Sequence, residues 1–156
     1  MIYRFIILMI VLWSSDIVQA HSPMYSVMIL QETENKTWNL QLSTSYTAFH
    51  HEIQTSYPDL DFKTLKPEAF QKLAIEHLKE NIELSFNGKE AIDFGKVYLQ
   101  IGHQTNVMLE VLNVPKDLIA IQVKNTSFKN IHKNQSSFKV LKATGNSDAF
   151  VLNKEN

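Results

Sequence analysis

Hydrophobic and polar residues alternate along the first part of the chain. Between positions 37 and 46 every second residue shares one face of an extended segment: Trp38, Leu40, Leu42, Thr44 and Tyr46. A period of two is typical of a β-strand with one buried side. A second strand is expected at Met24 to Glu32, joined to the first by the polar turn Glu34-Asn35-Lys36. Together these segments predict a β-hairpin.

The spacing changes in the middle of the chain. From Phe49 to Thr64 no regular period appears, and Tyr57-Pro58-Asp59 has the composition of a turn. A spacing of three and four residues follows Pro67, through Phe70, Leu73, Ala74, His77 and Leu78. This spacing predicts one amphipathic helix from Pro67 to Asn81, with proline suited to its first turn.

Short strands are expected again in the second half. Ile82 to Phe86 alternates, and Asn87-Gly88 is a strong hairpin signal. Further strands are expected at 97–101, 107–113, 118–123, 138–141 and 149–152. Short strands at this spacing are typical of a sandwich. The sequence therefore predicts a mainly β fold, an antiparallel Ig-like β-sandwich with one inserted amphipathic α-helix at about 67–81.

The first twenty residues have the pattern of a signal peptide. Arg4 precedes an apolar run from Phe5 to Trp13, and Val18-x-Ala20 places small residues where a signal peptidase cuts. We expect residues 1–20 to be removed and a single β-sandwich domain, 21–156, to be periplasmic or secreted. The alternative is a leader retained as a membrane anchor, because Asp16 is unusual so close to a cleavage site.

Composition excludes several classes of site and partner. The chain has no cysteine, which excludes disulfides, thiolate metal sites, a cysteine nucleophile and a lipid anchor on cysteine. A net charge of −1 without a basic cluster argues against nucleic-acid binding. After the leader no apolar run is long enough to span a membrane. An envelope protein or a small ligand remains as the expected partner.

Catalytic motifs are missing from the sequence. No serine lies in a Gly-x-Ser-x-Gly or Ser-x-x-Lys context, and four glycines provide no glycine-rich phosphate loop. We therefore predict a non-enzymatic binding or accessory module that needs no cofactor.

The alternative hypothesis is a copper- or zinc-binding periplasmic protein that uses the mature N-terminus. The α-amine and imidazole of His21 can chelate one ion, and nitrogen-rich ligand sets suit Cu(II). His103, near an expected strand end, and His50, beside His51, are the candidates for further ligands. An envelope enzyme using such a copper site is a third class. The opposing interpretation is that His21 only follows the cleavage site and that His50 is a solvated loop residue.

Several short segments occur in an order that resembles a known family. The leader is followed at once by His21 and by Tyr25-Ser26-Val27, and the chain then carries three further pieces, His77 to Lys89, Val123 to Thr126 and Asn134 to Ser137. The chain resembles an uncharacterised family of small exported bacterial proteins whose mature chains begin His-Pro. The resemblance covers essentially the whole mature chain and implies an exported location, but the family has no established activity.

Two departures from the family pattern concern the candidate ligands. Ser22 stands where proline is usual, with Pro23 one position later, and His50-His51-Glu52 occurs where acidic residues are expected. The resemblance therefore implies no metal-binding role for His50 or His51.

Overall fold

The computed structural model describes residues 25–89, 93–129, 135–145 and 147–152, so His21 and the leader lie outside the described residues. The elements in chain order are β1 (Tyr25–Glu32), β2 (Trp38–Ser45), α2 (Tyr46–Ser56), α3 (Pro67–Asn81), β3 (Ile82–Phe86), β4 (Phe94–Gln100), β5 (Gln104–Val111), β6 (Ile121–Asn125), β7 (Gln135–Leu141) and β8 (Ser147–Leu152).

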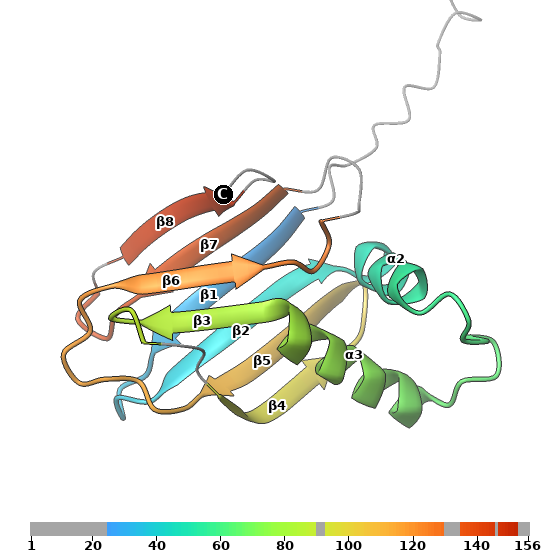
Figure 1. The fold of residues 1–156 in the computed structure, drawn as a ribbon, viewed down its shortest axis with the longest axis horizontal. Coiled ribbons are helices and arrows are strands. Elements are labelled where there is room, and N and C mark those ends of the chain that lie inside the picture. Colours follow the sequence, from blue (N-terminus) through green and yellow to red (C-terminus); the bar gives the residue numbers. More distant parts are fainter. Residues whose placement is uncertain (1–24, 90–92, 130–134, 146, 153–156) are drawn as a thin grey trace, which may run out of the picture.

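Six of these strands form one sheet in the order β4-β5-β2-β1-β7-β8. The strands β3 and β6 pair separately and antiparallel, and this two-stranded sheet is called the ribbon below. Figure 1 shows the ribbon and both helices on the same side of the six-stranded sheet. The fold is therefore mainly β, as the sequence predicts, with a second layer built from strands and helices.

Alternation along the strands creates the core between the two layers. In β2 the alternate residues Trp38, Leu40, Leu42 and Thr44 are buried, which confirms the predicted inward face. The register places Leu40 between Leu30 of β1 and Leu109 of β5, all three without solvent exposure. The second layer closes this core with the buried face of β3, formed by Ile82, Leu84 and Phe86.

The prediction of a single helix is wrong, because α2 occupies part of the stretch expected to be irregular. Ser45 ends β2 in an extended conformation, and its hydroxyl accepts a hydrogen bond from the Ala48 amide at 3.2 Å. This is an N-cap, which satisfies an amide that the first turn leaves unpaired. The helix buries Ala48, Phe49, Glu52 and Ile53. The polar Glu52 within this stripe hid the helical period in the sequence.

The prediction of an antiparallel fold is also only partly correct, because β1 pairs with β7 in parallel. A parallel pair needs a long crossover, and residues 33–134 lie between these two strands. Pairing of this kind is set by distant segments, which local patterns do not reveal. The Ig-like form of the predicted sandwich is not confirmed.

The helix predicted from Pro67 to Asn81 is confirmed as α3. The strand expected at 118–123 begins three residues later, at Ile121, and the one expected at 97–101 begins earlier, at Phe94. Within the described ranges, neither helix combines the length and the apolar composition that crossing a membrane requires.

Candidate functional site

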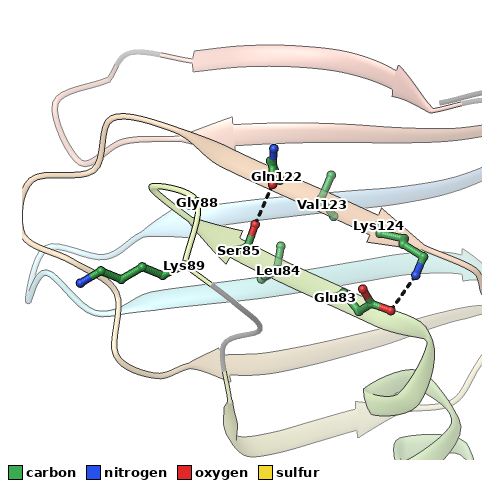
Figure 2. A pocket seen from close by; sticks show the side chains of 8 residues that line it. All are labelled: Glu83, Leu84, Ser85, Gly88, Lys89, Gln122, Val123 and Lys124. Atoms are coloured by element: carbon green, nitrogen blue, oxygen red, sulfur yellow. Dashed lines mark hydrogen bonds and ion pairs between the residues drawn. The ribbon is translucent and has the colours of Figure 1, made fainter.

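A hollow of about 330 Å³ lies on the ribbon. Figure 2 shows the residues that line it, which come from both strands and from the turn after β3: Glu83, Leu84, Ser85, Gly88, Lys89, Gln122, Val123 and Lys124. Its volume is near the lower end of the range for small-molecule sites, about 300 Å³.

Paired polar side chains form the wall of this hollow. The register sets Glu83 opposite Lys124 and Ser85 opposite Gln122. The Lys124 ammonium donates to Glu83 Oε1 at 2.8 Å, and the Ser85 hydroxyl donates to Gln122 Oε1 at 3.1 Å (Figure 2). Directly opposed residues on one face of an antiparallel pair are neighbours, so these contacts follow from the register.

The opposite side of β3 anchors the wall. Ile82, Leu84 and Phe86 are at most 2% exposed, so the alternate positions Glu83 and Ser85 face away from the core. The turn after β3 fixes the far end of the ribbon, because Asn87 and Gly88 both adopt positive φ angles of 54° and 71°. Such angles are typical of a two-residue hairpin turn.

The Asn87 side chain joins this turn to the segment before β6. Its Oδ1 accepts hydrogen bonds from the amides of Ile119 and Ala120 at 2.8 and 3.0 Å. Its Nδ2 donates to the Asp117 carbonyl at 2.7 Å. The two strands of the ribbon are therefore held together by backbone pairing and by this side chain.

A second polar group, the Glu52–His77 pair, is buried between α2 and α3. His77 Nε2 lies 3.0 Å from Glu52 Oε1, and the two residues are 4% and 5% exposed. Asn81 donates through Nδ2 to the His77 carbonyl at 2.8 Å, and the same nitrogen lies 3.4 Å from His77 Nδ1. Nδ1 faces the Asn81 donor, so the tautomer that fits these contacts accepts at Nδ1 and carries the ring proton on Nε2, directed at Glu52.

The hydrogen bonds of this buried pair extend through Asn81 to Thr126, the residue after β6. The Thr126 hydroxyl donates to Asn81 Oδ1 at 2.6 Å, and the Thr126 amide donates to the Asn81 carbonyl at 2.9 Å. Sequence analysis places His77 on the apolar face of the predicted helix, whereas the ring has polar contacts on both nitrogens. Glu52 was expected beside two loop histidines and is instead a buried partner. The pair is too enclosed to reach a ligand, so it holds the two helices and β6 together.

Tyr57 packs its ring on the same histidine, with centroids 5.7 Å apart. Burial raises the pKa of the Tyr57 hydroxyl above its usual value of 10, and the nearby carboxylates Glu80 and Glu76 raise it further. Both causes disfavour the charged phenolate.

The candidate metal ligands lie around one end of the six-stranded sheet. The Tyr46 amide, at the start of α2, donates to the His103 carbonyl at 3.2 Å. His50 lies one turn further along α2, with its ring 5.5 Å from that of Tyr46. His50 is therefore on a helix, half-buried beside Phe62 and Phe70, and not in the expected loop.

The first strand begins at the same end. Tyr25 is followed by Ser26, which pairs with Thr44, and the next residue of β2, Ser45, pairs with Gln104. His21 is outside the described residues, but four residues before Tyr25 can span at most about 14 Å. Within the described residues no group of three or more histidine and acidic side chains is placed to hold a metal ion.

Sequence analysis did not identify the hollow. The alternation of Ile82 to Phe86 indicates which β3 residues face outward, but the pairing with a strand nearly forty residues away has no local signal. Comparison with protein-family models and with curated proteins gives no match to this chain. The resemblance to a family of small exported proteins therefore stays a prediction.

Proposed function

We propose that this chain is an exported, non-enzymatic binding module that acts in the periplasm or outside the cell. Its ligand-binding surface is the hollow on the ribbon, and its ligand is a small neutral molecule rich in hydroxyl groups, such as a sugar unit. The observation that carries this proposal is the row of paired polar side chains on a rigid two-stranded support.

The chemistry of the hollow supports a neutral ligand. Lys124 and Glu83 neutralise each other at 2.8 Å, so the site does not favour a charged ligand of either sign. Lys124 is a donor, Glu83 an acceptor, and Ser85 and Gln122 each have both roles. Hydroxyl groups also donate and accept, so they complement such a row. Figure 2 shows the Lys89 side chain extending away from these four residues, so its charge does not alter this balance.

An NMR titration of ¹⁵N-labelled protein tests the proposal, with glucose as the neutral probe and acetate as the charged probe. We expect glucose to shift the amides of Ser85, Gly88 and Gln122, with a weaker response to acetate. Gln122→Ala removes an amide that faces the ligand and should abolish the response. Lys72→Ala, on the exposed surface of α3, is the control and should leave it unchanged. Glucose titration without shifts at the ribbon would contradict the proposal.

A metal-binding function is the second candidate, favoured by the arrangement at the end of the six-stranded sheet. His103 and the helix that carries His50 meet where β1 begins, within the reach of the segment that carries His21. A Cu(II) titration followed by EPR tests this on processed protein starting at His21. One extra residue before His21 separates the amine from the imidazole and should abolish tight, nitrogen-rich binding. Equal weak binding by both forms would exclude it.

A further inference from the structure

The second surface of interest is the side of the six-stranded sheet that faces away from the ribbon and the helices, here called the open face. None of the described elements covers it (Figure 1). Tyr98 is 60% exposed, Tyr25 53% and Met108 39%. The central strands β1, β2 and β5 contribute twelve residues to it: Tyr25, Val27, Ile29, Gln31, Asn39, Gln41, Ser43, Ser45, Gln104, Asn106, Met108 and Glu110.

The central strands of the open face carry little charge. Glu110 is the one charged residue among these twelve, although 20% of the whole chain is charged. Charged residues are depleted at the centre of protein interfaces, where tyrosine and methionine are enriched. A sheet face that only meets water does not require this depletion.

Some polar groups of the open face already form hydrogen bonds with each other. The Ser43 hydroxyl donates to Asn106 Oδ1 at 2.6 Å. Glu110 Oε2 accepts a hydrogen bond from the Lys96 amide at 3.1 Å. Covering a polar group is costly when its hydrogen bonds are lost, so these internal bonds lower the cost of covering the face.

One row across the sheet is self-complementary. The register aligns Tyr98 of β4, Met108 of β5, Gln41 of β2, Ile29 of β1 and Lys139 of β7, and continues to Ala149 of β8. Gln41 is the centre of the five residues from Tyr98 to Lys139, with an apolar residue on each side of it. A twofold axis parallel to β2, in the plane between two copies, would place β5 of one copy over β1 of the other and β4 over β7.

We propose that a second copy of this chain covers the open face, in a twofold dimer whose axis runs along β2. Met108 then packs on the partner's Ile29, and Tyr98 lies over the ammonium of the partner's Lys139. Gln41 faces the partner's Gln41, where two amides can hydrogen-bond reciprocally. The contacts of Met108 and Tyr98 each occur twice and the Gln41 contact lies on the axis, as an isologous interface requires.

The dimensions of the face fit a dimer. With the axis along β2, the five strands from β4 to β7 overlap. At a spacing of about 4.8 Å and a length of about seven residues they give a contact area on the order of 550 Å² per copy. A standard interface buries about 800 Å² per partner, measured over the relief of the side chains. The proposed dimer leaves the ribbon outside the interface, so the hollow stays accessible in both copies.

Sedimentation velocity of the processed chain over a range of concentrations tests this inference. We expect a monomer–dimer equilibrium, and Met108→Asp should weaken dimerisation at least about tenfold, as loss of a central contact does. Ile119→Asp changes a residue 88% exposed on the segment before β6 and is the matched control, which should dimerise normally. A monomer at all concentrations, or a dimer that tolerates Met108→Asp, would overturn the proposal.

Cross-linking gives a second measurement that does not depend on a disruptive substitution. The chain has no cysteine, so Gln41→Cys introduces a single thiol at the proposed axis. Packed sheets lie about 10 Å apart, so a short bismaleimide should join two copies at this position. Lys72→Cys on α3 leaves the open face intact, so this control should dimerise but should not be cross-linked. Equal cross-linking of both variants, or of neither, would count against the twofold arrangement.

Discussion

The buried Glu52–His77 pair should dominate the stability of the contact between α2 and α3. Substituting leucine for either residue tests this, alone and together. Glu52→Leu leaves His77 Nε2 without its acceptor at a site 4% exposed, which should cost about 1–3 kcal/mol of the free energy of unfolding. His77→Leu leaves the Glu52 carboxylate buried without its donor, which should cost about 3–5 kcal/mol.

The double substitution should cost less than the two single ones combined. With both residues replaced, no polar group of the pair stays buried without a partner, and the loss should be at most about 2 kcal/mol. The coupling free energy between the two positions is then at least about 2 kcal/mol. Glu52→Gln keeps an oxygen that can accept from His77 Nε2, so its cost should be the smallest of the series.

Urea unfolding followed by fluorescence measures these quantities. Trp38 is the only tryptophan after residue 20 and is 6% exposed, so its emission reports on the core. With a slope of about 1.5 kcal/mol per molar urea, a loss of 3 kcal/mol lowers the midpoint by about 2 M.

An exposed ion pair on α3 is the matched control for this cycle. Lys72 Nζ lies 3.9 Å from Glu76 Oε1, with side chains 79% and 55% exposed. Leucine at Lys72 and Glu76, alone and together, should show a coupling free energy of at most about 0.5 kcal/mol. If the coupling of the buried pair were equally small, Glu52 and His77 would not be in contact in solution, and the reasoning would be refuted.

Three further predictions concern other parts of the fold. Asn87→Ala removes three side-chain hydrogen bonds and places alanine at a φ of 54°, so thermal denaturation should show a loss of about 2 kcal/mol, whereas unchanged stability would contradict the described turn. Leu40→Ala opens a cavity at a site without exposure and should cost about 2–5 kcal/mol in urea unfolding; a loss below 1 kcal/mol would mean that the core there is loosely packed. The pKa of the Tyr57 hydroxyl is raised in the folded state, so the unfolded chain loses the hydroxyl proton first, near pH 10. The contribution of this group to the free energy of unfolding is therefore complete below pH 10 and is lost as the pH rises through the folded-state pKa. Tyr57→Phe should remove that part of the alkaline decline in stability, and an unchanged pH profile would show that the hydroxyl does not contribute.

Local patterns were sufficient for several elements. The alternation of Trp38, Leu40 and Leu42 predicted the buried face of β2, and the spacing after Pro67 predicted α3 with its bounds. Asn87-Gly88 predicted the turn after β3, which has the expected positive φ angles. In each case neighbouring residues decide the outcome, through side-chain direction, helix periodicity or the conformational freedom of one or two residues.

Tertiary structure decided the elements that depend on distant partners. The burial of Glu52 in α2 is explained only by His77, 25 residues later, which supplies its hydrogen bond. The parallel pairing of β1 with β7 and the register of the ribbon join segments far apart in the chain. The hollow and the self-complementary row both depend on such registers. A sequence determines locally which face of a strand is polar, but which strand lies beside it is settled by the packing of the whole core, because pairing energies are similar for many alternatives.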